Sequence, residues 1–396
     1  MQSTIEKEIS KIKDTLTKIR RDFHKNPELS GQEEETMAFI AGILESLGLS
    51  VTRNVGGYGI TGTLFGKKGG RTIALRADMD ALPITEKRDC DYKSTRPGIM
   101  HACGHDMHMA VLIGAAMVLS KVKEKLAGNV KFVFQPAEET VGGARGMMAD
   151  GVLNDPKVDT MIGLHVTPLI ETGKVGIKYG TMMASADKVH IVIKGRSGHA
   201  AQPHCTVDAI WVAAMVINAI HQIVSRRIDP LMPAIISLGM ISGGTAPNII
   251  ADRVEITGTA RSLTAEVREG LAEMIENVIK GVTDSVGADY EYTFTKGPPS
   301  LDNDEKMTDL VKATAISALG EDNVERIQKP TMGGEDFALY LNEIPGVFFR
   351  LGTGSKKRDT LHPLHNEMFD VDDDAITSGV LVMAMSVIKY LKGNGK

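Results

Sequence analysis

The segment M-H-A-C-G-H-D-M-H, residues 100–108, concentrates the residue types that bind transition metals. It holds three histidines, one cysteine and one aspartate within nine positions. Thiolate and imidazole groups suit zinc and similar first-row metals, whereas calcium and magnesium prefer oxygen ligands. The segment therefore predicts a transition-metal site. A redox or structural cysteine among solvated histidines is the alternative.

Two adjacent carboxylates, Glu138 and Glu139, close an apolar run that is typical of a buried strand, residues 130–139. Neighbouring side chains on an extended segment point to opposite sides, so one carboxylate could bind metal while the other faces a bound water or the substrate. A metal ion lowers the pKa of bound water to about 7, and a nearby carboxylate can then accept its proton. The pair predicts a ligand beside a general base, although most such pairs are solvated surface charges.

Histidines farther along the chain could complete the site. His165 ends another apolar run, where a lone histidine is more often a core residue than a ligand. His365 and His362 compete in the segment L-H-P-L-H-N-E near the C-terminus.

Cys103 could instead act as a nucleophile with a neighbouring histidine as its base. The three histidines and several carboxylates beside it favour a metal site, and a chelator would abolish activity only in a metal enzyme. Cys90 and Cys205 have no such neighbours and are expected to be ordinary buried or half-buried residues.

Strands and helices alternate in the part of the chain that carries these residues. Apolar runs at 72–80, 130–139 and 159–166 each end in polar residues, and helix-like segments 109–126 and 143–153 lie between them. This alternation predicts an α/β fold, in which ligands gather beyond the carboxyl ends of the strands. The polar clusters would then meet at one edge of the sheet.

Asp78 and Asp80 close the first of these runs. Alternation along a strand would put both carboxylates on one face, where they could orient a metal ligand. An ion pair with Arg76 is the alternative.

From about residue 186 the pattern changes to strand, helix, two strands, helix and strand, which is the order βαββαβ. This order is typical of the ferredoxin-like unit, which folds as a compact domain of roughly a hundred residues. We therefore expect an inserted domain at 186–296. Residues 1–185 and 297–396 would form a discontinuous catalytic domain with a three-layer α/β fold.

The 396-residue chain has a net charge of −5 and a pI near 6.1, which give no general attraction to nucleic acid or to an anionic membrane surface. Residues 4–25 and 33–47 predict amphipathic helices, and the N-terminus lacks the continuous apolar stretch of a signal peptide. No apolar run approaches the length of a membrane span. We expect a cytoplasmic protein without nucleic-acid or membrane partners.

Ordered motifs along the chain resemble the amidohydrolase branch of the dinuclear zinc exopeptidase family, which includes hippurate hydrolases, N-acetyl-amino-acid deacetylases and indole-acetyl-amino-acid hydrolases. The resemblance runs nearly end to end through R-R-D-F-H-K-N-P-E-L-S (20–30), A-L-R-A-D-M-D-A-L-P (74–83), M-H-A-C-G-H-D-M-H (100–108), F-Q-P-A-E-E (134–139), S-G-H-A-A-Q-P-H (197–204), G-G-T-A-P-N-I-I (243–250), G-G-E-D-F (333–337) and P-L-H-N-E (363–367). It implies a catalytic α/β domain interrupted by a small lid domain, in agreement with the order of strands and helices.

The resemblance also implies a site with two divalent metal ions. The metal ligands would be Cys103, His105, Glu139, His165 and His365. Glu138 would be the general base, and Asp80 would orient a ligand. Zinc is the expected metal, with manganese, cobalt or nickel as alternatives.

In the lid, His199 resembles the family's oxyanion-stabilising histidine, and a positioned donor of that kind can lower a barrier by roughly 3 kcal/mol. Asn248 and Arg261 match residues that hold the substrate's carboxylate, for which a guanidinium fork is well shaped. Family members commonly dimerise through the lid, so we expect a homodimer or a dimer of dimers, with His199 serving the partner's active site. The alternatives are a solvated turn for His199 and a strand-surface ion pair for Arg261.

The implied reaction is hydrolysis of the amide bond of an N-acyl-L-amino acid, such as an N-acetyl or benzoyl derivative, by a metal-bound hydroxide. The products would be a carboxylate and a free amino acid. A carboxypeptidase or a dipeptidase would use the same metals and base, and would differ only in the acyl pocket. A catalytically dead metabolite binder is a third alternative, and the retention of Glu138 beside a complete ligand set argues against it.

Overall fold

The computed structural model describes residues 1–67, 70–140 and 142–393, and the chain divides into two compact units. The first unit consists of Met1–Gly180, Asp302–Gln328 and Leu339–Lys396. The second unit consists of Thr181–Leu301 and Lys329–Ala338.

The second unit includes a loop, residues 329–338, that the sequence analysis assigned to the catalytic domain. Backbone hydrogen bonds explain this difference. The amide of Ala184 donates to the carbonyl of Gly333 at 2.9 Å, and the amide of Thr331 donates to the carbonyl of Met182 at 3.0 Å. These contacts join the loop to the first residues of the second unit.

The first unit is built on an eight-stranded sheet with the order β1-β2-β4-β3-β5-β16-β6-β15. Its strands are β1 (Ser50–Val55), β2 (Gly59–Leu64), β3 (Thr72–Asp78), β4 (Asn129–Gln135), β5 (Thr160–Glu171), β6 (Val175–Ile177), β15 (Val324–Arg326) and β16 (Gly346–Gly354). β3 pairs in parallel with β4 and β5, and β5 pairs in parallel with β16. The carboxyl ends of these four central strands therefore point toward the same edge of the sheet.

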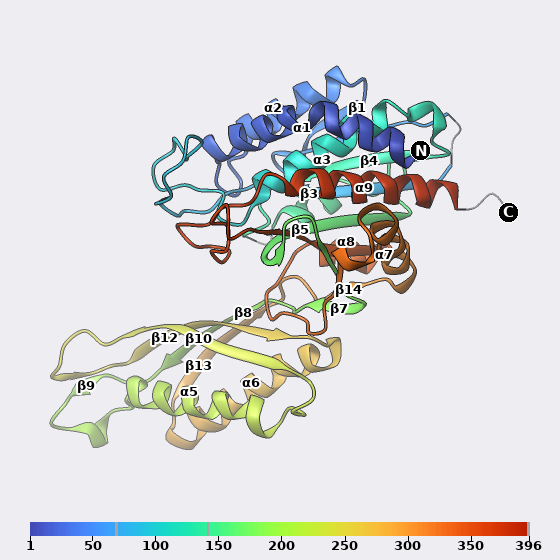
Figure 1. Ribbon diagram of the computed structural model, residues 1–396. Helices are drawn as coiled ribbons and strands as arrows, with labels where there is room; N and C mark the ends of the chain where they lie inside the picture. The colour runs from blue at the N-terminus through green and yellow to red at the C-terminus, as the bar shows by residue number, and fades with distance from the viewer. Residues whose placement is uncertain (68–69, 141, 394–396) are drawn as a thin grey trace. The chain divides into compact units, whose positions relative to one another are not determined.

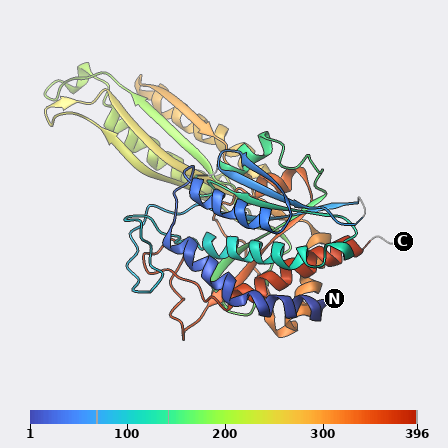
Figure 2. The ribbon, with the colours of Figure 1, turned by 90° about the horizontal axis from the view of Figure 1, so that it is seen from above.

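Every residue of the central strands β3 and β4 is buried, which indicates that both faces of the sheet are covered. The helices of the unit are α1 (Gln2–Lys25), α2 (Glu34–Ser46), α3 (His105–Ser120), α4 (Gly143–Ala149), α7 (Glu305–Leu319), α8 (Ala338–Glu343) and α9 (Ala375–Lys392). α1, α3 and α9 pack on one another, and α3 and α9 also pack on the sheet (Figure 1, Figure 2). The predicted α/β fold is confirmed.

The acidic pair lies beyond the end of a strand, not on it. β4 ends at Gln135, because Pro136 has no amide hydrogen to continue the ladder and Ala137 has a left-handed φ of 51°. Glu138 and Glu139 therefore lie in a turn. Strand alternation, which the sequence analysis used to separate their directions, is the wrong explanation.

α3 begins at His105, directly after a glycine turn, and not at residue 109 as predicted. Gly104 has a φ of 83°, and a β-carbon there would lie 2.5 Å from Cγ2 of Val166. Both the backbone conformation and the close approach require glycine. This turn fixes the start of a helix that is buried along nearly its whole length.

The second unit has the predicted ferredoxin-like order. Its main elements are β8 (Asp187–Lys194), α5 (Ala209–Arg226), β10 (Ala234–Gly243), β12 (Arg253–Ser262), α6 (Ala265–Val286) and β13 (Asp289–Thr295). The four strands form an antiparallel sheet with the order β10-β12-β8-β13. Two short strands, β9 (Gly198–His199) and β11 (Ile249–Ile250), form a separate antiparallel pair. β7 (Gly180–Met183) lies where the chain enters the unit, and β14 (Leu301–Asn303) lies where the chain leaves it.

Within the described residues, two helices, α5 and α9, are long and apolar enough to cross a membrane by length and composition alone, in contrast to the expectation that no apolar run approaches that length. α9 is mostly buried in the core of the first unit, and α5 buries Val212, Val216 and Ile220 in the core of the second. Burial in the core accounts for the composition of α9, whereas α5 also exposes apolar side chains. Cys205 ends a surface 3-10 helix before α5 and is exposed, so the prediction that it is buried or half-buried is wrong.

Candidate metal centre

Five side chains of the first unit bring metal-binding atoms together from four segments of the chain. They are Cys103, His105, Glu139, His165 and His365. Cys103 Sγ lies 3.4 Å from Nε2 of His165 and 3.3 Å from Nε2 of His365. Glu139 Oε1 lies 3.3 Å from Nε2 of His365 and 4.0 Å from Nε2 of His105. The sequence placed these residues up to 262 positions apart, and folding gathers them into one cluster.

Backbone carbonyls orient two of the imidazoles. Nδ1 of His105 donates to the carbonyl oxygen of Asp80 at 2.8 Å, and Nδ1 of His165 donates to the carbonyl oxygen of Val166 at 2.7 Å. A ring nitrogen that donates in this way leaves the other nitrogen with its lone pair. Both rings therefore present an Nε2 lone pair to the cluster.

The Asp80 carboxylate joins two of the candidate ligands. Its Oδ2 accepts hydrogen bonds from Oγ of Ser30 at 2.6 Å and from the amide of Glu139 at 3.0 Å. Its Oδ1 lies 3.3 Å from Nδ1 of His105. Asp80 is thus placed to hold the His105 ring and the Glu139 turn in one arrangement.

The electrostatics of the cluster fit a cation. Among the residues that the structure describes, Nε2 of His105 and Oε1 of Glu139 are buried without a hydrogen-bond partner, which is rare for polar atoms in a protein interior. Burial would lower the pKa of His105, yet the charges of Asp78 and Cys103 raise it well above its usual value. The surroundings therefore stabilise positive charge at this point, and the imidazole, thiol and carboxylate donors suit a divalent metal ion.

His108 has a role that the sequence analysis did not assign. Its Nδ1 donates to Oδ1 of Asp78, and its Nε2 accepts a hydrogen bond from the amide of Val166 at 2.9 Å. Asp78 also makes the predicted alternative contact, an ion pair of 2.6 Å with Arg76. The pair of Asp78 and His108 therefore anchors the backbone beside His165.

His365 lies in a loop between β16 and α9, so it needs support from outside its own segment. It has a left-handed φ of 62°, and its amide donates to the carbonyl of Ala102 at 2.8 Å. His362, the competing candidate, faces Oδ1 of Asp359 at 3.7 Å. The structure therefore brings His365 to the cluster and pairs His362 with a surface carboxylate.

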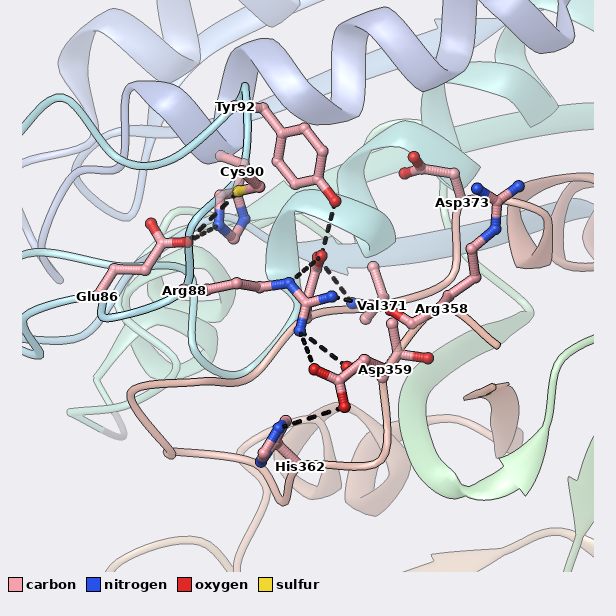
Figure 3. A network of polar contacts seen from close by, with 12 residues as sticks. Glu86, Arg88, Cys90, Tyr92, Arg358, Asp359, His362, Val371 and Asp373 are labelled. Atoms are coloured by element: carbon pink, nitrogen blue, oxygen red, sulfur yellow. Dashed lines mark hydrogen bonds and ion pairs between the residues drawn. The ribbon is translucent and has the colours of Figure 1, made fainter. Parts of the chain in front are cut away.

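A buried polar network around Asp370 fixes the same loop. Its carboxylate accepts from Tyr92 Oη at 2.7 Å, and it lies 3.1 Å from Nε of Arg88 and 2.6 Å from Nη2 of Arg20. Figure 3 shows Arg88 and Tyr92 within this network, with Arg88 also reaching Asp359. Arg20 Nε lies 2.9 Å from Asp106, the residue after His105. The network therefore ties the loop of His365 to the start of α3.

The predicted lid residues all lie in the second unit, in two places. His199 is exposed on β9, and Asn248 is its neighbour, because the carbonyl of Asn248 accepts from the amide of Ala200 at 3.1 Å. Arg261 lies near the C-terminal end of β12, and its Nη1 donates to the carbonyl of Met332 at 2.9 Å. Within one chain, the structure does not bring the three together.

A cluster of this composition, beside further carboxylates and at the strand-end edge of an α/β unit, is typical of a metal-dependent hydrolase. The sequence profile of peptidase family M20/M25/M40 matches residues 74–389, and the chain belongs to this family. The predicted family and the predicted hydrolase class are confirmed.

Three relatives align with nearly the whole chain. The chain is 46% identical over 376 residues to a protein of Synechocystis sp. named "Probable hydrolase", with 95% of each chain covered. It is 40% identical over 387 residues to the N-acetyl-L-cysteine deacetylase of Bacillus subtilis, with 98% of this chain and 90% of the relative covered. It is 38% identical over 392 residues to thermostable carboxypeptidase 2 of Saccharolobus solfataricus, with 98% of each covered.

A solved structure of similar fold comes from Bacillus subtilis and is described as a dinuclear metal binding peptidase of the M20 family. Its TM-score to this chain is 0.84 at 34% identity, with 97% of this chain and 99% of the other covered.

Proposed function

We propose that the chain hydrolyses the amide bond of N-acyl-L-amino acids and releases a carboxylate and a free amino acid. The five-residue cluster carries this proposal, because one thiol, three imidazoles and one carboxylate form overlapping groups of three whose ligand atoms lie close together, beside the second carboxylate, Glu138. The similarity to a deacetylase of N-acetyl-L-cysteine supports an N-acylated amino acid as the substrate class.

The cluster would hold two divalent metal ions, with zinc expected from its thiolate and imidazole donors and manganese, cobalt or nickel as alternatives. Bound there, the ions would polarise the scissile carbonyl and lower the pKa of the attacking water. Asp80 would keep His105 and Glu139 oriented, as its contacts with both residues indicate.

Glu138 would be the general base. It is 8% exposed, and a carboxylate oxygen lies within 4.8 Å of ligand atoms of His105 and Glu139. In the proposed reaction its carboxylate takes a proton from the water as the water oxygen bonds to the acyl carbon. Glu138 then gives that proton to the amide nitrogen as the carbon–nitrogen bond breaks.

Glu138→Gln tests this assignment. The variant should keep its metal, measured by elemental analysis, and lose turnover by about 10²- to 10⁴-fold, because an amide cannot accept the proton. Glu34→Gln, at an exposed position of α2, is the matched control and should behave as the wild type. Wild-type turnover by metal-loaded Glu138→Gln would contradict the assignment.

A carboxypeptidase activity is the second candidate, and the similarity to a thermostable carboxypeptidase over 98% of both chains favours it. The two activities differ in the acyl group that the site accepts. Values of kcat/KM for an N-acetyl amino acid, for hippurate and for a dipeptide would separate them.

The second unit would supply substrate-binding residues, His199, Asn248 and Arg261. Arg261 lies eight residues beyond Arg253, the first residue of β12. At about 3.4 Å per residue, the two ends of this stretch are roughly 27 Å apart. His199 pairs with β11, which closely precedes β12. One small substrate cannot reach both ends, and this separation supports the proposal that His199 serves the partner's active site in a homodimer.

An exposed apolar surface on the second unit supports dimerisation through this domain. Ile210, Trp211 and Met215 are 50%, 51% and 45% exposed on α5, and Met240 is 72% exposed on the neighbouring edge strand β10. Apolar side chains and an unpaired strand edge favour association with a second copy. The unit would then act as both lid and dimerisation domain.

A cytoplasmic location is also proposed. The three cysteines are free, which suits a compartment that keeps thiols reduced.

A further inference from the structure

We propose that Glu33 is a positioning residue for Glu138: its buried carboxylate holds Ala137 in the conformation that directs the general base toward the metal ligands. The inference rests on the proposed role of Glu138. It assigns a function to the segment just before α2, which neither the metal cluster nor the substrate residues explain.

The contact itself is a hydrogen bond between distant parts of the chain. Oε1 of Glu33 accepts from the amide of Ala137 at 2.8 Å, across 104 positions of sequence. Ala137 directly precedes Glu138 and has a φ of 51°, a left-handed conformation that is unfavourable for alanine. A hydrogen bond to that amide therefore stabilises a backbone that the chain would otherwise leave, and the direction of the Glu138 side chain depends on it.

Glu33 does not serve the helix that it precedes. It occupies the N-cap position of α2, yet its side chain makes no capping hydrogen bond. The first amides of α2 are satisfied by Glu28, whose carboxylate accepts from Glu35 at 3.3 Å and from Thr36 at 2.8 Å. The carboxylate of Glu33 is therefore available for the turn at Ala137.

The position is costly for a carboxylate, because burial removes the charged group from water. Glu33 is fully buried, and within the described part of the chain its Oε2 has no hydrogen-bond partner. Burial raises the pKa of Glu33 to about 7, against the amide of Ala137, which lowers it. Perturbed carboxyl groups of this kind concentrate at functional sites.

The neighbouring residues show that the whole segment touches the site. Ser30 donates to Oδ2 of Asp80 at 2.6 Å, and the carbonyl of Glu28 accepts from the amide of Ala81 at 2.7 Å. The segment from Glu28 to Glu33 thus contacts both strand-end loops that carry acidic residues of the cluster, at Asp80 and at Ala137.

The test uses four variants of the full chain. Glu33→Met fills the space without an oxygen acceptor, and Glu33→Gln keeps an oxygen acceptor without the charge. Glu34→Gln, one position along and exposed, is the matched control. Ala137→Gly, made in the Glu33→Met background, gives the turn a residue that adopts positive φ freely.

Glu33→Met should lose about tenfold or more in kcat, with KM and metal content within about twofold of the wild type. Glu33→Gln should stay within about threefold of the wild type, because it still accepts from the Ala137 amide. Adding Ala137→Gly to Glu33→Met should recover a large part of the lost kcat. A role for Glu33 in folding alone would not be rescued at residue 137, so thermal denaturation of each variant is recorded beside the kinetics.

Wild-type kcat in Glu33→Met, or no recovery in Glu33→Met/Ala137→Gly, would overturn the inference. If Glu138→Gln is inactive while Glu33→Met is fully active, only this inference fails. If Glu138→Gln itself turns over normally, the general-base assignment fails and this inference fails with it.

Discussion

Replacing Gly104 with alanine should weaken both the fold and the metal site, because Gly104 forms the turn between Cys103 and His105. Its φ is 83°, and an added β-carbon would lie 2.5 Å from Cγ2 of Val166. The left-handed conformation costs a non-glycine residue roughly 1–2 kcal/mol. Overpacking against a buried neighbour costs roughly 1–3 kcal/mol more. We therefore expect Gly104→Ala to lower the free energy of unfolding by about 2–5 kcal/mol.

Gly48→Ala is the matched control, because Gly48 has a φ of 75° and no atom within 4 Å of an added β-carbon. It should lose only the conformational part, about 1–2 kcal/mol. Urea unfolding of the metal-free proteins measures both losses, and titration with zinc measures the affinity of the site. Gly104→Ala should also bind zinc more weakly, because a distorted turn would displace Cys103 relative to His105. Equal losses of stability in the two variants would refute the role assigned to the Val166 contact.

Three further predictions follow from other contacts. Arg88→Gln removes a charged donor from the buried carboxylate of Asp370 and should lower the free energy of unfolding, measured by calorimetry, by about 1–3 kcal/mol. The control Lys87→Gln, at an exposed position, should change this free energy by less than about 0.5 kcal/mol. Equal effects of the two variants would contradict the role assigned to the network. Burial opposes protonation of His24, yet the carboxylates that accept its hydrogen bonds raise its pKa to about 9, above the unfolded value of 6.5. The contribution of His24 to the free energy of unfolding should be complete below pH 6.5 and lost as the pH rises to about 9. The same dependence of the unfolding free energy on pH in a His24→Gln variant would refute this prediction. Mixing His199→Ala with Glu138→Gln protein should restore activity in mixed dimers, and no recovery after proven subunit exchange would count against a shared site.

The residue types of the metal cluster could be read from the sequence because thiol, imidazole and carboxylate groups are rare in such density. Cys103 and His105 stand in one motif, whereas Glu139 and His165 were assigned as ligands only through the family resemblance, because strand-end placement left the roles of both open. Residue type alone left His365 and His362 open, because both stand in the same short segment. The structure separates them through the loop, where the amide of His365 binds the carbonyl of Ala102.

The ferredoxin-like unit could also be predicted, because the order of its elements is local information. The loop 329–338 could not be assigned to it, since the hydrogen bonds that hold this loop join residues about 150 positions apart, such as Ala184 and Gly333. Periodicity carries no signal for contacts of this kind.

The least predictable part of the site is the turn of the acidic pair. The sequence indicated Glu138 and Glu139, but an extended strand was the wrong geometry for them. Pro136 ends the ladder, and the direction of the pair then depends on Ala137 and on Glu33, which the sequence places 104 positions away. Ser30 and His108 were likewise without a role until their partners, Asp80 and Asp78, were known.

Release of free amino acid from N-acetyl-L-amino acids, by protein stripped with a chelator and then reloaded with one metal at a time, tests the central claim most directly. We predict no release by the stripped protein, and full recovery when two divalent ions per chain are restored. Undiminished release by protein that elemental analysis proves to be metal-free would contradict the account, as would a reloaded protein with two bound ions that cleaves no N-acyl amino acid.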